Sequence, residues 1–175
     1  SLPTPLLLAC LAATLALPQT ALASLWTGNA NDQLWATAGN WNSNYDSGST
    51  PPATGNSIWL DANATSSNHP IFTSEQGTLS VSAIYMYGVA GSHLDLTGGS
   101  LTANSLGMAT DAGSSATFNL SGGTFETTGE LQVGVSAAGT LTQTGGTLSS
   151  SSYHVVGRNN GSNGTLNLSG GTVNG

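Results

Sequence analysis

Carboxylates are the side chains through which this chain could act on sugars or metal ions, and they are few and scattered. The sequence contains eight Asp or Glu residues, and a glycosidase needs two of them facing each other across a cleft. Only Glu126 and Glu130 are close in sequence. We expect them on successive strands, where an exposed acid on a polar face is far more common than a catalytic pair.

Histidine and serine offer a second kind of chemistry. His69, His93 and His154 are far apart and lack zinc-site spacing, and we expect His154 at an outward strand position. No Gly-x-Ser-x-Gly elbow selects a nucleophile for a Ser-His-Asp triad. The calcium repeat Gly-Gly-x-Gly-x-Asp is missing, although Asp111 in a Gly- and Ser-rich loop could bind calcium weakly. We therefore predict that the protein is not an enzyme and has no catalytic, metal-binding or cofactor-binding residues.

Aromatic residues support two interpretations. Indole faces stack on pyranose rings, so the tryptophans could form a sugar-binding platform, with Tyr85 and Tyr87 beside Gly88 as further candidates. They could instead form a compact cap over the first open edge of a repeat array, which such arrays need for solubility. The sequence favours the cap. The four tryptophans are Trp26, Trp35, Trp41 and Trp59.

Charge excludes one class of partner. One Lys or Arg stands against the eight acids, for a net charge of −7, and charged residues make up 5% of the chain, against roughly 25% in an ordinary soluble domain. Arg158 is the single basic side chain apart from the histidines. No basic surface can therefore release counterions from DNA or RNA, and we predict that the protein does not bind nucleic acid.

Four Gly-Gly pairs divide the second half of the chain into units of nearly constant length, with spacings of 24, 23 and 25 residues. Similar residues surround each pair, as in Leu94-Asp-Leu-Thr-Gly-Gly-Ser-Leu101. A fixed period of this size is typical of an array in which each unit buries its apolar face against its neighbours. The pairs are Gly98-Gly99, Gly122-Gly123, Gly145-Gly146 and Gly170-Gly171.

Within each unit, apolar residues alternate with polar ones as they do in strands. Three short strands in about two dozen residues, with glycine at the corners, make one coil of a β-solenoid. We predict an all-β parallel β-solenoid with coils of about 24 residues and a Trp-rich N-terminal cap. Gln143 breaks the pattern, and we expect it to bond with a neighbouring coil. The expected inward residues are Phe118, Leu120, Phe125, Leu131 and Val133, and the expected outward ones are Asn119, Glu126 and Gln132.

An antiparallel array of β-hairpins is the alternative fold, because Ser-Gly-Gly-Thr between apolar strands is also a type I′ hairpin signal. The short strands favour the coil, since a four-stranded propeller blade needs about 40 residues. Thr or Ser also recurs at equivalent places and would stack as a polar ladder in parallel register. These residues are Thr97, Ser121, Thr144 and Ser169.

The N-terminal segment has a different composition. The apolar run through residues 6–17, followed by Ala21-Leu-Ala23, predicts a signal peptide over residues 1–23 and a mature N-terminus at Ser24. Cys10 could be a lipidated lipoprotein cysteine, but apolar residues follow it, which favours an incidental position. We expect a cap and first strands over 24–77 and repeats over 78–175, and we interpret both ends of the sequence as fragment ends.

The repeat unit Leu-x-Leu-(Ser/Thr)-Gly-Gly-(Thr/Ser)-Leu, and the opening Trp26-Thr-Gly28 with Gly39-Asn-Trp41, resemble exported bacterial β-helix proteins. These carry autotransporter-associated β-strand repeats, and many end in a PEP-CTERM sorting signal. The resemblance covers residues 24–175. It implies an extracellular or surface-attached stalk and brings no catalytic residues.

We therefore expect a non-catalytic structural or adhesive protein, secreted or at the bacterial cell surface. Extracellular polysaccharide or the cell envelope are its expected partners, with membrane contact only through the signal peptide or a C-terminal anchor, and with end-to-end self-association at the last coil. The first alternative is a carbohydrate-binding module. The second is a fragment of a polysaccharide-active enzyme. Parallel β-helix lyases are similar in architecture but need a basic residue, and Arg158 lies in a loop-like segment.

Overall fold

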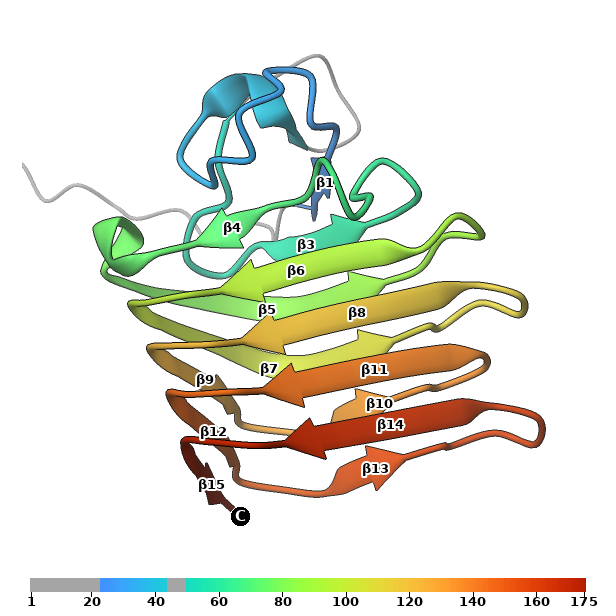
Figure 1. The fold of residues 1–175 in the computed structure, drawn as a ribbon. Helices are drawn as coiled ribbons and strands as arrows, with labels where there is room; N and C mark the ends of the chain where they lie inside the picture. Colours follow the sequence, from blue (N-terminus) through green and yellow to red (C-terminus); the bar gives the residue numbers. More distant parts are fainter. Residues whose placement is uncertain (1–22, 44–49) are drawn as a thin grey trace, which may run out of the picture.

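The chain folds into a parallel β-solenoid of about 5 turns in the computed structural model. The structure describes residues 23–43 and 50–175. Figure 1 shows the coils stacked one below another, with the cap above the first coil and the C-terminus at the far end. The predicted signal peptide and Cys10 lie outside the described residues, apart from Ala23, with which β1 begins.

The strands are short except for two. β5 (Thr78–Met86) and β7 (Ser100–Met108) each run through the second and third sides of a coil, whereas later coils divide the same path into two strands. The other strands are β1 (Ala23–Trp26), β2 (Trp41–Ser43), β3 (Ser57–Leu60), β4 (Ile71–Phe72), β6 (Ser92–Leu96), β8 (Ser115–Leu120), β9 (Thr124–Thr127), β10 (Leu131–Val133), β11 (Ala138–Gln143), β12 (Thr147–Ser150), β13 (His154–Val156), β14 (Asn163–Leu168) and β15 (Thr172–Asn174).

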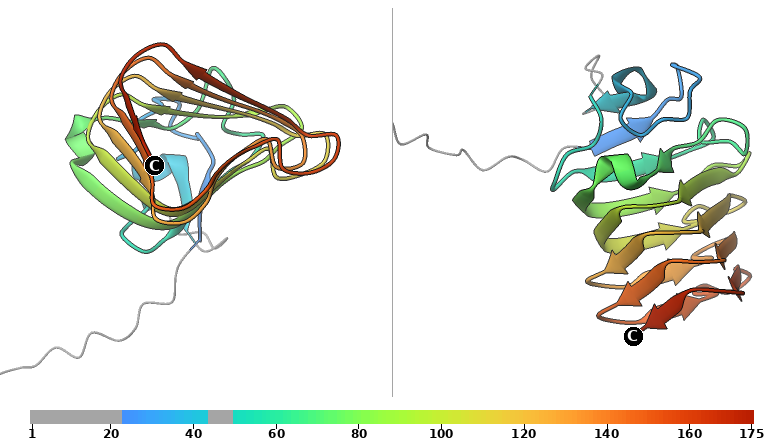
Figure 2. Two further views of the ribbon diagram at one scale, coloured as in Figure 1. Left: turned by 90° about the horizontal axis from the view of Figure 1, so that it is seen from below. Right: turned by 60° about the vertical axis from the view of Figure 1, so that its left-hand side comes forward.

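Two sheets form the walls of the solenoid. One has the order β15-β12-β9-β7-β5-β3-β1-β2, with β10 and β13 continuing from β7, and the other has the order β14-β11-β8-β6-β4. Every pairing of strands is parallel except that of β1 with β2. The view along the axis in Figure 2 shows successive coils superposed. The solenoid prediction is confirmed and the hairpin alternative is wrong, because β8 and β9 flank Gly122-Gly123 but lie in different sheets.

Inward side chains of successive coils stack into columns that form the core. Leu94, Phe118 and Leu141 are register partners on β6, β8 and β11, and all three are completely buried. Alternation along each strand, combined with parallel register, thus makes one continuous core. The five residues predicted to face inward are all fully buried. Asn119, Glu126 and Gln132 lie at the partly exposed outward positions, as predicted.

Several polar residues occupy inward positions, and two of them, Gln143 and His154, bear on the expectations from the sequence. Gln143 donates from Nε2 to the carbonyl oxygens of Gly146 at 3.2 Å and of Thr172, in the next coil, at 3.0 Å, so its predicted bond with a neighbouring coil is confirmed. His154 was expected to face outward, and this is wrong. Its register partner is the buried Leu131, and parallel register therefore places His154 in an inward column.

Glycine at the corners allows the coils to approach each other closely. Gly123, the second residue of its pair, has φ +75°, and a Cβ there would lie 2.4 Å from the carbonyl oxygen of Gly99 in the preceding coil. Both the positive φ and the contact exclude a side chain at this corner. The Gly-Gly repeat in the sequence is thus the signature of this backbone-to-backbone contact.

The cap comprises β1, β2, the short 3-10 helix η1 (Ala38–Asn40) and their connecting loops. Trp26 and Trp35 pack edge-on against Trp41, with ring centroids 5.0 and 4.9 Å apart. Trp35 also contacts Phe72 of β4 at 5.1 Å and so joins the cap to the first coil. Within 23–43 and 50–175, no helix has the length and apolar character that a membrane crossing requires.

Candidate functional site

The tryptophans divide into a buried group and one surface residue. Trp26, Trp35 and Trp41 have at most 2% of their surface exposed, so none presents a face to a ligand, and the sugar-platform interpretation is wrong for these three. Trp59 is different because it occupies an outward position of β3 and is partly exposed. It is the tryptophan around which a surface site can form.

Trp59, Tyr85 and Tyr87 form an aromatic strip across the first two coils. Trp59 and Tyr85 are register partners on β3 and β5, and their ring centroids lie 5.0 Å apart. The Tyr87 ring stands edge-on to Trp59 at 5.6 Å, with an interplanar angle of 87°. All three residues are partly exposed. Parallel pairing therefore sets an indole and two phenols side by side at fixed angles.

The strip ends at the next coil because Gly107 is the register partner of Tyr85 there. A Cβ at Gly107 would lie 3.0 Å from Cγ2 of Thr110 and 3.9 Å from Cδ1 of Tyr85. A side chain at this position would crowd the threonine and extend beside the tyrosine ring. Glycine therefore leaves this side of the Tyr85 ring without a neighbouring side chain from its own strand position.

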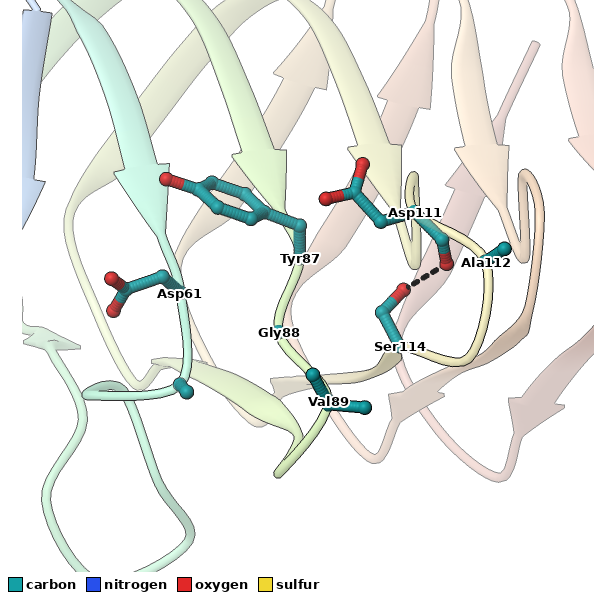
Figure 3. Close-up of a pocket in the computed structure, with 8 residues that line it drawn as sticks. Asp61, Tyr87, Gly88, Val89, Asp111, Ala112 and Ser114 are labelled. Atoms are coloured by element: carbon teal, nitrogen blue, oxygen red, sulfur yellow. Dashed lines mark hydrogen bonds between the residues drawn. The ribbon is translucent and has the colours of Figure 1, made fainter.

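A hollow of about 340 Å³ opens beside the strip, where three successive coils turn after their third side. Asp61 follows β3, Tyr87 and Val89 follow β5, and Asp111 and Ser114 follow β7; all five line it. Figure 3 shows the side chains of Tyr87 and Asp111 on the same side of the coil turns that carry them. Val89 is 82% exposed, so an apolar side chain lies uncovered at the rim.

Backbone hydrogen bonds between coils hold the turns that form the hollow. The N–H of Tyr87 donates to the carbonyl of Leu60 at 2.8 Å, and the N–H of Ser115 donates to the carbonyl of Gly88 at 3.2 Å. Gly88 has φ +137°, and a Cβ there would lie 2.6 Å from the backbone nitrogen of Ala62. Because only glycine permits this approach, the position of Val89 relative to the preceding turn is fixed.

The two carboxylates beside the hollow accept hydrogen bonds from residues that are close to them in sequence. Asp61 accepts from the backbone and side-chain nitrogens of Asn63 at 2.8 and 3.3 Å. Asp111 accepts on Oδ1 from the Thr110 hydroxyl at 3.4 Å, while its backbone carbonyl accepts from the Ser114 hydroxyl at 2.6 Å. The site thus combines apolar ring surface with carboxylate oxygens that are near the protein surface.

A second cluster lies on the outer face of the other sheet. His69 Nε2 lies 3.1 Å from Asp95 Oδ2, and Asn119 donates to Asp95 Oδ1 at 2.8 Å. The His93 ring centroid is 5.7 Å from that of His69. His69 is 8% exposed, and its Nδ1 lies 3.0 Å from the carbonyl of Thr65. This ring therefore joins the loop before β4 to β6.

The two histidines have pKa values shifted in opposite directions. Burial alone would lower the pKa of His69, but its hydrogen bond and charge interaction with Asp95 outweigh burial, so this pKa is raised above its ordinary 6.5. Burial and the adjacent His69 lower the pKa of His93 below 6.5. Burial would raise the pKa of Asp95, but bonds from His69 and Asn119 outweigh it, so this pKa is lowered below 3.8. Folding therefore favours the protonated form of His69 beside the Asp95 carboxylate and the neutral form of His93.

Trp59, Tyr85 and Tyr87 were each expected as sugar-binding candidates, but the sequence did not group them, and it did not group His69 with Asp95, for identifiable reasons. Asp95 and Asn119 are 24 residues apart on outward positions, and aligning the repeats in register would have placed them side by side. Trp59 and Tyr85 could have been aligned the same way across 26 residues. His69 lies in a non-repeating loop, and no periodic signal links it to Asp95.

The two glutamates considered for catalysis belong to one coil but to different segments of it. Glu126 lies at an outward position of β9. Glu130 precedes β10, accepts from Arg158 at 2.9 Å and also accepts from Gln132. Among the described residues, no group of three or more His, Cys, Asp or Glu side chains is arranged to hold a metal ion.

Comparisons with protein-family models, with curated proteins and with solved structures found no match to this chain.

Proposed function

We propose that this chain is part of an exported, non-catalytic structural or adhesive protein, in which the solenoid serves as a stalk at the bacterial cell surface or in the extracellular matrix. The observation that carries the proposal is the uninterrupted register of the coils. β8, β11 and β14 align over six consecutive residue pairs each, from Ser115 to Leu168. A repeat of this kind produces length, because each added coil stacks on the one before it.

The outward surface of the coils suits a stalk. Thr117, Thr140 and Thr165 are register partners on the outer face of the second sheet, and uncharged hydroxyl and amide side chains dominate such positions. With a net charge of −7 and 5% charged residues, the surface is hydrated without a strong local field. The predicted signal peptide, and the resemblance to proteins with autotransporter-associated repeats, support export.

The positions of the acids favour a non-catalytic role. Glu130 forms an ion pair with Arg158 at 2.9 Å, and Glu126 projects from β9, before the segment that carries Glu130. A retaining or inverting glycosidase would need two carboxyl groups about 5–10 Å apart across a substrate cleft. The interior of the coils, where a deep site would lie, is filled by completely buried side chains such as Leu120 and Leu141.

The test is the location of the protein in the bacterium that produces it. An epitope inserted into the exposed loop at residues 159–162 should be reached by antibody on intact cells and removed by externally added protease. A matched insertion at the C-terminal side of β12, around Ser151, should behave in the same way, because both positions are exposed. Labelling that appears only after the cells are opened would contradict the proposal.

A further inference from the structure

The outer face of the first coils carries both the aromatic strip and the hollow, and we propose that together they bind a glycan of neutral or amine-bearing hexopyranose units. The strip supplies Trp59, Tyr85 and Tyr87, and the hollow supplies Asp61 and Asp111. This assigns a ligand class to the adhesive role proposed above and rests on that role only for its biological setting.

The rings fit one side of a sugar. A pyranose ring presents C–H groups on its faces and hydroxyls around its rim, so a partner must combine flat apolar surface with hydrogen-bonding groups. The rings of Trp59 and Tyr85 have centroids 5.0 Å apart and are tilted by 45° to each other, and the pairing of β3 with β5 fixes the strand positions from which they project. Binding therefore costs little side-chain entropy, which favours affinity. Gly107 keeps the next strand position clear beside Tyr85.

The carboxylates fit the rim of the sugar. Ionised Asp61 and Asp111 are acceptor-only groups, and sugar hydroxyls or amines are donors that match them. Both line the hollow with Tyr87 and the exposed Val89. The volume, about 340 Å³, is at the lower end of the 300–1,000 Å³ typical of small-molecule sites. It therefore suits a sugar unit at the end or edge of a longer chain that continues along the strip.

Charge selects among glycans. Two acids line the hollow, and the single Arg of the sequence, Arg158, pairs with Glu130 at 2.9 Å on a later part of the solenoid. A uronic acid or sulfated sugar would therefore meet like charge without a compensating cation, whereas an amino sugar would gain a favourable contact. Acidic polysaccharides are consequently the disfavoured ligands.

The site is confined to one end of the solenoid. The register position held by Trp59 and Tyr85 is held by Gly107, Gln132 and Val155 in the following coils. The later coils thus lack the strip while sharing the same backbone. They provide internal controls, because Tyr153 before β13 is 72% exposed but is not part of the strip.

The experiment is calorimetric titration of the purified full chain with four hexasaccharides: β-1,4-linked glucose, N-acetylglucosamine, glucosamine and galacturonic acid. At least one of the first three should bind, and the galacturonic acid hexamer should bind at least about tenfold more weakly. Tyr87→Ala should weaken binding about tenfold, equivalent to about 1.4 kcal/mol. Asp111→Asn should weaken it severalfold. The matched controls Tyr153→Ala and Glu126→Gln should stay within about twofold of the wild type.

Folding is checked by thermal unfolding of each variant, and Tyr87→Leu, which keeps apolar volume, replaces Tyr87→Ala if the latter does not fold. The proposal is overturned if the first three hexamers fail to bind, if the galacturonic acid hexamer binds most tightly, or if Tyr153→Ala weakens binding as much as the change at Tyr87. Because the titration uses purified protein, its failure leaves cell-surface location unaffected, and failure of the epitope test leaves sugar binding unaffected.

Discussion

The cap and the repeats bury equally complete cores by different means. In the repeats, backbone ladders and stacked aliphatic columns hold one coil to the next, and the same residue types recur at each position. In the cap, hydrogen bonds from individual polar side chains supplement the short ladders of β1 with β2 and β3. Asn40 is fully buried, accepts from the N–H of Ala30 at 2.9 Å, and donates to Asp32 at 2.6 Å and to the carbonyl of Leu34 at 3.1 Å.

The difference extends to the backbone. Among the described residues, the non-glycine residues with positive φ are Asn31, Gln33 and Ala109, and two of the three lie in the cap. Apart from Ala109, the repeats use glycine at such places. The cap is therefore specified by particular residues in particular bonds, whereas the repeats are specified by a pattern that many sequences satisfy. Substitutions should reveal this as a difference in tolerance.

The largest expected effect on stability comes from a loss of side-chain volume in the core. Phe118→Ala should lower the free energy of unfolding by about 3–5 kcal/mol, because Phe118 is fully buried and contacts Phe125 edge-on at 4.9 Å. Phe118→Leu should cost less than about 1.5 kcal/mol, since leucine already occupies this column in adjacent coils. In the cap, Trp41→Leu should cost at least about 3 kcal/mol, because the bond from Trp41 Nε1 to the carbonyl of Trp35 at 2.7 Å is also lost. Urea unfolding measures the loss of stability for all three variants. Equal losses for Phe118→Leu and Trp41→Leu would contradict the expected difference in tolerance between the repeats and the cap.

The next effect compares two asparagines. Asn40→Ala should cost about 2–3 kcal/mol, because it removes three hydrogen bonds, one of them to the Asp32 carboxylate, and leaves a void where a fully buried side chain lay. Asn119→Ala should cost about 0.5–1.5 kcal/mol, because Asn119 makes one bond, to Asp95, at a partly exposed position. An outward position alone would predict a nearly silent change at Asn119, and the bond to Asp95 raises the expected cost. Urea unfolding at pH 7 checks the order, and a larger loss at Asn119 would contradict it.

A smaller effect is expected at Gln143. The Oε1 atom is buried without a hydrogen-bond partner, while Nε2 bonds the next coil. Gln143→Leu removes the unsatisfied acceptor and restores the aliphatic column of Leu120, at the cost of two donated bonds, so the stability should change by no more than about 1 kcal/mol. Thermal unfolding compares it with Gln143→Ala, which opens a cavity and should cost more. A Leu variant as unstable as the Ala variant would show that the bond to the next coil dominates.

The smallest expected effect is on the pH dependence of stability, which should have opposite signs for the neighbouring His69 and His93. The pKa of His69 is raised on folding, so its stabilising contribution is complete below pH 6.5 and is lost as pH rises through the folded pKa. The pKa of His93 is lowered, so His93 disfavours folding as pH falls below 6.5. His69→Gln should therefore destabilise more at pH 5 than at pH 8.5, and His93→Gln should destabilise less at pH 5 than at pH 8.5. The differences should lie within about 1 kcal/mol, because Asp95 and His93 are partly exposed and solvent screens their interactions with His69.

Urea unfolding of wild type and both variants at the two pH values makes this measurement. Asp95 stays ionised at pH 5 because its pKa is lowered below 3.8, so the His69 partner is present throughout. The same sign of pH dependence for both variants would contradict the assignment of charge within the cluster.

The repeats could be predicted from sequence because one physical rule acts at every coil. The close contact at Gly123 requires glycine, and alternation places Phe118 and Leu120 inward. The sequence pattern is therefore enough to predict the fold of the repeats. The cap could be predicted only as a Trp-rich cover. Its turns depend on bonds such as those of Asn40 and Asp32, which have no period. The inward position of His154 was missed because its residue type was given more weight than its register with Leu131.

The surface groupings follow the same logic. Register alone would bring Trp59 beside Tyr85, so the strip was within reach of the sequence once the early coils were aligned. The hollow was not, because it depends on the path of the turns around Gly88 and Val89. The contact of His69 with Asp95 likewise depends on how a non-repeating loop folds back.

The most direct test of the account is disulfide formation between engineered cysteines in a chain carrying Cys10→Ser. Asn119 on β8 and Thr142 on β11 are register partners in neighbouring coils, so Asn119→Cys with Thr142→Cys should cross-link under mild oxidation without loss of the β-sheet circular-dichroism signal. Asn119→Cys with Glu126→Cys should remain reduced, because β8 and β9 belong to different sheets. A hairpin across Gly122-Gly123 would instead place residues 119 and 126 opposite each other. Cross-linking of the second pair and not the first, measured by mass spectrometry, would contradict the stacked solenoid and the stalk function based on it.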